Sequence, residues 1–341
     1  MGKSRWFFIS HSYFFCYAIM CFKKPSLRRA LLLILFLAVI AYTINKFHGL
    51  SADDALLRSL YTPFDAKSPE LDNELSSTVE YIPRIIHQTY KTNILPEAWV
   101  EPYQTCLYFN PADKWRRVLW TDETSRDFIR DFYPSFLPTY DGYPYNIQRV
   151  DAFRYFVLHY YGGIYLDLDI GCKKDLSPLL KQHAFFAKTE PHGVSNDVMG
   201  MKRGHPVFAN LVAALQENDY RRGTKYPTVM MSTGPLFVTN LLLDFLKSRL
   251  HGQVAGIQQS QHPESLVAIL PPVLYGTSPY SYFRHYEGST WHSWDARLVL
   301  AISRRPALFV VGVLLSVASC TCIRYRRRVP RRPYASVAVE V

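Results

Sequence analysis

Hydrophobic positions recur at helical spacing in one central stretch of the chain, residues 146–161. They would share one face of a helix, and they are Ile147, Val150, Phe153, Val157 and Tyr161. Asn146 is suited to cap the start of this helix, and the pair Gly162 and Gly163 is suited to end it. The run Ile164-Tyr-Leu-Asp-Leu-Asp-Ile-Gly follows directly and predicts a buried β-strand.

Two further strands and a helix are predicted upstream. The run from Ile82 to Tyr90 indicates a short buried strand that ends in polar side chains, and the run from Trp115 to Asp122 indicates another. Residues 98–109 between them have helical character. Because strands that alternate with helices favour an open, mostly parallel α/β sheet, we expect one domain over residues 80–303 with a single crevice of nucleotide size.

Two apolar runs flank this body and predict two transmembrane helices. Residues 306–323 contain no charged side chain, and such a helix is about 27 Å long, close to the thickness of a membrane's hydrocarbon core. The first run, residues 30–44, is shorter, so we extend its helix over residues 30–47 with basic side chains reaching the interface. It is interpreted as an uncleaved anchor, and residues 6–22 are left open as a third span or an interfacial segment.

The basic residues are concentrated at the two ends of the chain. Residues 1–47 carry seven Lys or Arg and no acidic side chain, and residues 304–341 carry eight Lys or Arg and one acidic side chain. The ends together carry +14, more than the net charge of +11, and the mildly acidic body gives no reason to expect a nucleic-acid partner. By the positive-inside rule, segments 1–29 and 324–341 are cytosolic, and everything between the two spans, including a polar stem at residues 48–79, is lumenal.

The composition of the 341 residues, 48% apolar and 20% charged, excludes a disordered or collagen-like chain. Of the six cysteines, only Cys106 and Cys172 fall in the body. A lumenal disulfide between them and two free buried thiols fit the sequence about equally well.

The strand after the central helix carries two acidic residues, Asp167 and Asp169. Residues two apart share a face of a strand, so we expect these carboxylates to project together while Leu166 and Leu168 enter the core. Two close carboxylates on a buried strand repel each other, and Mg²⁺ or Mn²⁺ together with substrate phosphates would relieve that repulsion. A pair of exposed acids closing a strand is the alternative, and the pair alone does not decide between the two.

Two charged residues of the preceding helix, Asp151 and Arg154, are three apart and lie on adjoining turns of one face. That helix runs straight into the strand with the two carboxylates. The forked donors of Arg154 suit a diphosphate, and Asp151 is suited to accept from sugar hydroxyls. An ordinary ion pair on the helix surface is the alternative interpretation.

Taken together, four motifs resemble the Asp-x-Asp sugar transferases of glycosyltransferase family 32, which include fungal mannosyltransferases and certain bacterial glucosylating toxins. The motifs are Ile82-Pro-Arg-Ile-Ile-His-Gln-Thr-Tyr-Lys-Thr, Trp120-Thr-Asp, Arg149-Val-Asp-Ala-Phe-Arg-Tyr and Gly162-Gly-Ile-Tyr-Leu-Asp-Leu-Asp. The resemblance covers residues 82–295. It implies a GT-A fold, GDP-mannose as donor, a divalent cation, and transfer that retains the α-configuration of the sugar.

Within that family, three more motifs and the second apolar run resemble the catalytic subunits of fungal mannosyl-inositol-phosphoryl-ceramide synthases. The motifs are Asn196-Asp-Val-Met-Gly, Ser232-Thr-Gly-Pro-Leu-Phe and Gly288-Ser-Thr-Trp-His-Ser-Trp-Asp. This resemblance implies an enzyme of sphingolipid biosynthesis in the Golgi membrane, or more broadly in the ER and Golgi. It also implies inositol-phosphoceramide as acceptor and a multi-spanning regulatory subunit as partner.

The resemblance further assigns roles to single residues. Asp169 would bind the cation, while Asp167 would contact the sugar or ribose and also serve the cation. Asp151 and Arg154 would hold the sugar. His87 and Gln88 would lie near the nucleotide, and Asn196 and Asp197 near the acceptor or the reacting sugar.

His292 is a further candidate ligand for the cation or a phosphate. The alternative for it is an aromatic cluster at the membrane interface, since Trp291 and Trp294 flank it. Only residues 296–305 separate this motif from the second apolar run, which favours an acceptor held in the membrane as a lipid headgroup.

Other functions stay open at this point. The same donor site would serve a mannosyltransferase that extends protein-linked glycans, such as N-glycan outer chains. A non-catalytic membrane adaptor is opposed by the intact set of Asp and Arg residues. A metal-dependent phosphohydrolase is opposed by the lack of a further His and Asp cluster for a second metal.

Overall fold

The computed structural model describes residues 49–62, 79–190, 192–254, 266–286, 288 and 294–297. The predicted spans at residues 30–47 and 306–323 lie outside these ranges. So do the two terminal segments 1–29 and 324–341, residues 63–78 of the predicted stem, and His292.

Strands and helices alternate along the predicted domain, residues 80–303. The strands are β1 (Ile85–Thr89), β2 (Arg116–Trp120), β3 (Gly163–Leu166), β4 (Ile170–Cys172), β5 (Ala184–Lys188), β6 (Val194–Met201), β7 (Ala268–Leu270) and β8 (Phe283–His285). The helices are α3 (Glu97–Phe109), α4 (Asp122–Phe132), α5 (Leu137–Gly142), α6 (Asn146–Tyr161), α7 (Pro206–Glu217), α8 (Lys225–Ser232), α9 (Pro235–Val254) and α10 (Pro272–Tyr275). Short 3-10 turns lie at Pro134–Phe136 and Ser177–Lys181.

Six of the strands form one sheet in the order β2-β1-β3-β6-β5-β7. Five of them run in the same direction, and β6 runs opposite to its neighbours β3 and β5. The expected open, mostly parallel α/β sheet is therefore confirmed. The two upstream strands and the helix between them are found as β1, β2 and α3.

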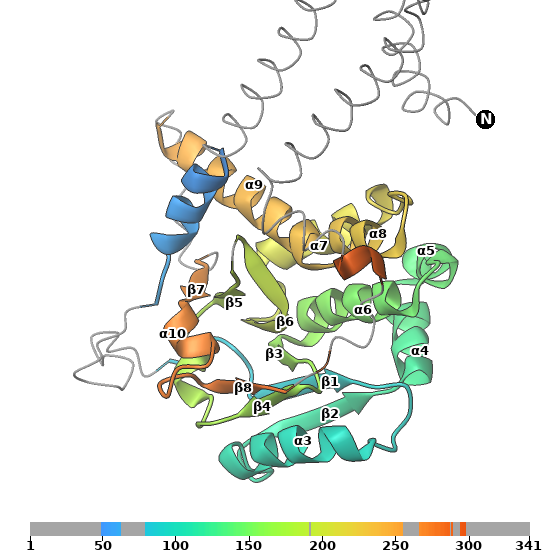
Figure 1. Cartoon of the computed structure of the whole chain (residues 1–341), viewed down its shortest axis with the longest axis vertical. Helices are drawn as coiled ribbons and strands as arrows, with labels where there is room; N and C mark the ends of the chain where they lie inside the picture. The colour runs from blue at the N-terminus through green and yellow to red at the C-terminus, as the bar shows by residue number, and fades with distance from the viewer. Residues whose placement is uncertain are drawn as a thin grey trace, which may run out of the picture.

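Both faces of this sheet are covered. Helices α6, α7 and α9 lie over one face and α3 lies on the other side (Figure 1). Tyr165 and Phe186 enter the core on the α6 side, whereas Ile164 and Phe185 enter the core on the α3 side. Because neighbouring strand residues point to opposite faces, a sheet covered on both sides buries nearly every strand residue.

Helix α6 occupies the predicted range, residues 146–161. The predicted cap is wrong, because Tyr145 stands at the N-cap position with no capping side-chain bond and Asn146 is the first helical residue. The predicted end is confirmed. Gly162 has φ = 68°, and a Cβ atom there would lie 2.7 Å from the backbone nitrogen of Arg203, so only glycine fits this turn.

The predicted strand through Asp167 and Asp169 is wrong in one respect. Strand β3 ends at Leu166, the next three residues form a turn, and β4 begins at Ile170 in a separate two-stranded sheet with β8. Leu168 is buried at the centre of this turn, while both acids are partly exposed. The physical reason is that β4 finds its partner in β8, more than 100 residues later in the chain, and has to leave the main sheet to reach it.

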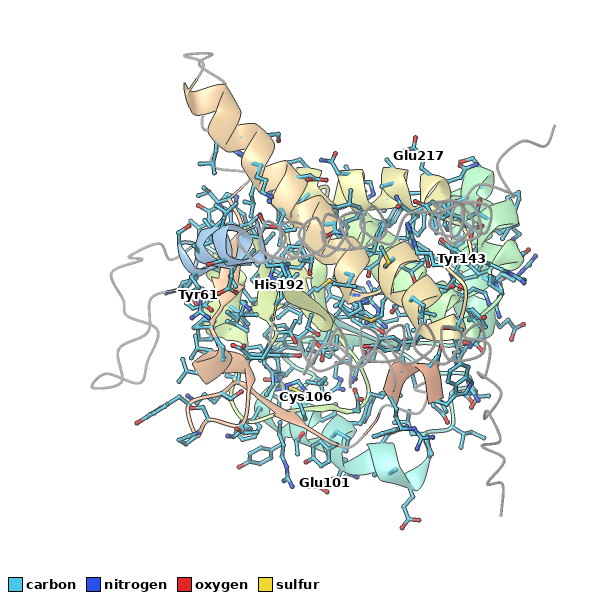
Figure 2. The ribbon with its side chains drawn as sticks, turned by 45° about the horizontal axis from the view of Figure 1, so that its top comes forward. Tyr61, Glu101, Cys106, Tyr143, His192 and Glu217 are labelled. Carbon is cyan, nitrogen blue, oxygen red and sulfur yellow. A yellow bond between two sulfur atoms is a disulfide. The ribbon has the colours of Figure 1, made fainter. Side chains whose placement is uncertain are left out.

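The first half of the predicted stem is packed against the domain rather than standing free. Residues 49–58 are helical and Leu57 is fully buried. Asp53 pairs with Lys247 of α9, and Asp54 pairs with the buried Lys188 of β5 at 3.0 Å. Tyr61 then forms a parallel bridge with β7, beside the sheet (Figures 1 and 2).

Cys106 and Cys172 form a disulfide that joins α3 to β4 (Figure 2). The sequence fitted either a disulfide or two free thiols, and the structure shows the disulfide.

Within the described ranges, one helical stretch, Lys225–Leu250, is long and apolar enough to cross a membrane by composition. It comprises α8 and most of α9, and 56% of its most apolar window is buried inside the domain, as in the core helix of a globular protein.

Candidate active site

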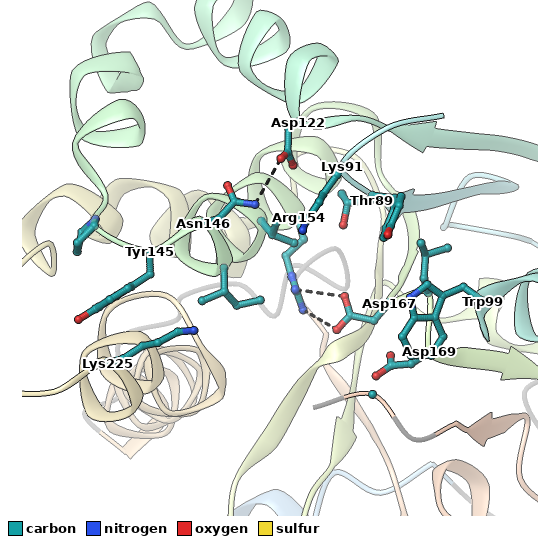
Figure 3. A pocket seen from close by; sticks show the side chains of 16 residues that line it. Thr89, Lys91, Trp99, Asp122, Tyr145, Asn146, Arg154, Asp167, Asp169 and Lys225 are labelled. Carbon is teal, nitrogen blue, oxygen red and sulfur yellow. Dashed lines mark hydrogen bonds and ion pairs between the residues drawn. The ribbon is translucent and has the colours of Figure 1, made fainter. Parts of the chain in front are cut away.

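A cavity of about 500 Å³ opens where β1 and β3 end, at the carboxyl edge of the parallel strands (Figure 3). The segment after β1 contributes Thr89, Tyr90 and Lys91, and α3 contributes Trp99. The other side is formed by Tyr145 and Lys225. The cavity lies at the edge of an open α/β sheet where ligands usually bind.

The turn after β3 places both predicted acids, Asp167 and Asp169, on the cavity wall. Asp167 accepts a hydrogen bond from the Tyr165 hydroxyl at 2.9 Å, and its backbone nitrogen donates to Asp197 at 2.9 Å. The carbonyl of Asp169 accepts from the backbone nitrogen of Tyr286 at 2.8 Å. The turn is thus held from three sides, and its two carboxylates are held at the cavity.

Arg154 connects α6 to this turn. Its guanidinium pairs with Asp151 at 3.0 Å and with Asp167 at 3.2 Å, and it donates to the carbonyl of Asn196 at 2.6 Å. The side chain is only 2% exposed and lies over the ring of Tyr165. The pair with Asp151 is therefore buried, not a surface pair. Arg154 lines the cavity, but much of its donor capacity is used to fix Asp167.

Asp151 and Asn196 lie behind Arg154, outside the cavity lining. The carboxylate of Asp151 accepts from the amide of Asn196 at 3.1 Å and from the hydroxyl of Thr233 at 3.0 Å. The Asn196 amide also donates to the Tyr155 hydroxyl at 2.9 Å. Both residues support Arg154 from within the core, and a direct contact with the sugar stays a prediction.

His87 and Gln88 are buried in the sheet and are not part of the cavity lining. Trp120 donates its indole hydrogen to Nδ1 of His87 at 3.2 Å, so Nε2 carries the proton and donates to the Gly162 carbonyl at 3.0 Å. Burial lowers the pKa of His87 to about 4, which keeps the ring neutral. Gln88 accepts from Arg117. The polar residues of this motif that reach the cavity are the next ones, Thr89 to Lys91.

Asp197 lies close to the acidic turn, and its carboxylate accepts from the Tyr275 hydroxyl at 2.7 and 2.8 Å. His285 of β8 stands beside it, with Nδ1 at 3.9 Å from the carboxylate and Nε2 at 3.0 Å from the Tyr275 carbonyl. The local sequence pattern indicates neither a site role for His285 nor this contact of Tyr275. The fold brings them in because β8 pairs with β4, directly after the acidic turn.

The charges of the turn favour a bound cation. Burial raises the pKa of Asp167 to about 7 against the opposing charge of Arg154, and Asp169 and Asp197 raise it further. Burial and Asp197 also raise the pKa of Asp169. Burial and the neighbouring acids both disfavour ionised carboxylates here, and a hard divalent cation bound to their oxygens would stabilise the ionised form. Across the described ranges, no cluster of three or more acidic, His or Cys side chains forms a full set of metal ligands. Substrate phosphates would complete the coordination beside the two carboxylates, as is common for Mg²⁺. The further candidate ligand His292 lies outside the described residues.

Gly288 begins one of the motifs that carry the family resemblance, and the motif alone assigns it no role. It lines the cavity beside Asp169, and the ideal position of a Cβ atom there would overlap the Asp169 carboxylate. Glycine at this position lets the backbone after β8 lie directly against the acidic turn.

Comparison with known proteins identifies the class. Residues 96–186 match the family described as a glycosyltransferase sugar-binding region containing a DXD motif. This range includes the acidic turn, α6 and most of the cavity wall, and it defines a glycosyltransferase.

The similarity to three fungal proteins extends over two thirds or more of this chain. Inositol phosphoceramide mannosyltransferase 3 of Schizosaccharomyces pombe is 43% identical over 67% of this chain and 61% of its own length. Inositol phosphoceramide mannosyltransferase 1 of the same organism is 37% identical over 80% of this chain and 84% of its own length. Mannosyl phosphorylinositol ceramide synthase SUR1 of Saccharomyces cerevisiae is 40% identical over 79% of this chain and 65% of its own length. The chain belongs to the Asp-x-Asp sugar transferases, glycosyltransferase family 32. It spans a little under two thirds of the first and third of these relatives.

A solved structure, PaToxG Glycosyltransferase, is similar with a TM-score of 0.37 and 17% identity, over 63% of this chain and 86% of that chain.

Proposed function

We propose that the protein transfers mannose from GDP-mannose to the inositol headgroup of inositol-phosphoceramide, with a divalent cation, in sphingolipid biosynthesis. The observation that carries the proposal is the acidic turn, which holds Asp167 and Asp169 with raised pKa values at the wall of a ligand-sized cavity. The relatives named above include two inositol phosphoceramide mannosyltransferases, which supports the choice of donor sugar and acceptor.

The donor diphosphate would lie against the acidic turn. A divalent cation bound by Asp169, with Asp167, would stabilise the negative charge that develops on the leaving diphosphate. Arg154 holds Asp167 in place and adds a fixed positive charge at the cavity wall. Trp99 and Tyr90 on the β1 side offer flat side chains to the nucleotide.

We propose that the sugar is transferred with retention. The bond from the anomeric carbon to the phosphate oxygen breaks, and the acceptor hydroxyl oxygen bonds to the same face of that carbon. The hydroxyl proton passes to the departing phosphate oxygen. Asp151, a conceivable nucleophile, lies behind Arg154 and is bonded on both oxygens, which supports attack by the acceptor itself. A trapped covalent mannosyl-enzyme would contradict this mechanism.

We further propose a membrane enzyme of the Golgi with the domain in the lumen, anchored by residues 30–47 and 306–323. The disulfide between Cys106 and Cys172 supports an oxidising compartment. The two proposed spans would provide surfaces for a multi-spanning regulatory subunit, and they would anchor the domain at the membrane that holds the acceptor.

The test uses the detergent-solubilised full chain with labelled GDP-mannose and inositol-phosphoceramide. Asp169→Asn should lower turnover by about a hundredfold or more, because an electrostatic contribution to the leaving group is lost. The exposed Asp113 lies outside the cavity lining, and Asp113→Asn is the matched control that should behave as wild type. Full activity in EDTA, or in Asp169→Asn, would overturn the proposal. Equal activity on detached N-glycans would favour a protein-glycan mannosyltransferase instead.

A further inference from the structure

One wall of the cavity carries a lysine that the reaction described above does not use. Lys225 is the first residue of α8, and its ammonium lies 5.9 Å from the centre of the Tyr145 ring. Both side chains line the cavity. In Figure 3 they lie on the opposite side of Arg154 from Asp169, so they face the acidic turn across the cavity.

The charge of Lys225 is not balanced by an acidic side chain within the described part of the protein. Two fully buried cations differ from Lys225 in this respect, since Arg154 pairs with Asp151 and Asp167, and Lys188 pairs with Asp54. An ammonium on a cavity wall without an acidic partner is available for a charge-assisted hydrogen bond to an anionic ligand.

A contact with a residue near the C-terminal end of the domain holds the start of α8, where Lys225 lies. The backbone nitrogen of the next residue, Tyr226, donates to the buried carboxylate of Asp295 at 2.7 Å. Asp295 therefore already accepts a hydrogen bond from one of the free backbone N–H groups in the first turn of α8. The ammonium of Lys225, rather than the end of the helix, is the group that remains for a ligand.

We propose that Lys225 binds the phosphate of the acceptor, the phosphodiester that joins inositol to ceramide. This inference rests on the proposed function. It assigns to Lys225 the preference of the enzyme for an acceptor that carries a negative charge. The donor diphosphate belongs at the acidic turn, and the anomeric carbon of the donor has to lie within reach of both this diphosphate and the acceptor hydroxyl. An anion on the Lys225 side of the cavity therefore comes from the acceptor. The ring of Tyr145 restricts the ammonium to the cavity wall.

The first measurement separates the two substrates kinetically. In the full chain, Lys225→Met should raise the KM for inositol-phosphoceramide by about ten- to a hundredfold, the effect of losing one charge-assisted hydrogen bond. The KM for GDP-mannose should shift much less, and Lys225→Arg should restore most of the acceptor affinity. Lys114 is exposed and lies outside the cavity lining, so Lys114→Met is the matched control for loss of one positive charge. A rise in the KM for GDP-mannose instead, or an unchanged KM for the acceptor, would overturn the proposal.

The second measurement is direct binding, which does not depend on turnover. Inositol 1-phosphate should bind the wild type by calorimetry and bind Lys225→Met at least tenfold more weakly. Inorganic phosphate alone serves as the comparison that shows whether the inositol ring contributes. Equal binding of inositol 1-phosphate by both proteins would refute the role of Lys225. If inositol 1-phosphate binds through Lys225 but the wild type does not mannosylate inositol-phosphoceramide, the proposed function fails and the anion site stands.

Discussion

Gly288 packs directly against the carboxylate of Asp169, with no room between them for a methyl group. This contact ties the segment after β8 to the residue that is best placed to bind a cation. A side chain at 288 would have to move either that segment or the carboxylate.

Gly288→Ala should therefore weaken cation binding. We expect the affinity for Mn²⁺, followed by electron paramagnetic resonance, to fall about ten- to a hundredfold, the range found when the support of a metal ligand is disturbed. Gly142→Ala is the matched control, because a Cβ atom at residue 142 meets nothing within 4 Å. Unchanged Mn²⁺ affinity in Gly288→Ala would show that the segment simply moves away.

Arg154→Met should destabilise the domain. It leaves the carboxylates of Asp151 and Asp167 without their shared counter-charge, and loss of one partner of a buried ion pair costs about 3–5 kcal/mol. Chemical denaturation of the solubilised protein measures this loss. Adding Asp151→Asn removes one of the stranded charges and should recover part of the stability without restoring mannosyl transfer. If the single variant is as stable as wild type, Arg154 does not support the acidic turn.

Cation affinity should depend on pH through Asp167. Its raised pKa of about 7 means that, without a cation, the carboxyl is mostly protonated below pH 7 in the folded protein. The cation has to displace that proton, so Mn²⁺ affinity should rise with pH up to about 7 and then level off.

The stability of the cation-free protein should change with pH in the opposite direction. The folded state holds a proton that the unfolded state releases above about pH 4, so this carboxyl lowers stability as the pH rises from about 4 to about 7. Asp167→Asn should flatten both dependences, and a variant with the same slopes would contradict the assignment.

The disulfide should matter for stability more than for chemistry. Cys106 and Cys172 are 66 residues apart in sequence, so the bond closes a long loop. Replacing both by serine should lower the free energy of unfolding by about 2–4 kcal/mol. The bond lies behind the acidic turn and outside the cavity lining, so the KM for GDP-mannose in the folded fraction should stay near its wild-type value. A Tm equal to that of the wild type would show that the bond closes a loop already ordered by its surroundings.

Local patterns predicted the elements that are built from nearby residues. The spacing of α6, its glycine end and the alternation of β1, α3 and β2 are all visible over short windows of sequence. The two acids were located in the sequence, but the turn that holds them was not. Spacing by two is the same for a strand and for this turn, and β4 turns away because of its partner β8, which no local window contains.

The same limit applies to the nucleotide motif, where the roles of His87 and Gln88 stay predictions. His87 and Gln88 look like exposed polar residues at the end of a strand, yet a sheet covered on both faces buries them and leaves only the residues beyond the strand at the cavity. Lys225 follows a polar, basic stretch that resembles a solvated loop. Its place in the cavity depends on how α8 packs against residues 294–297, a contact set by tertiary structure alone.

The helix at residues 49–58 should stabilise the domain through the ion pair of Asp54, and much less through that of its neighbour Asp53. Asp54 neutralises the fully buried ammonium of Lys188, whereas Asp53 pairs with the half-exposed Lys247. Asp54→Asn should therefore cost about 2–3 kcal/mol, somewhat below the range for a fully buried pair because Asp54 keeps 21% of its exposure. Asp53→Asn, its matched control, should cost less than about 1 kcal/mol. Thermal denaturation of the two variants compares them, and adding Lys188→Met to Asp54→Asn should recover stability by removing the stranded charge. Equal losses in the two single variants would mean that the helix is held by Leu57 alone and that the buried lysine finds its counter-charge elsewhere.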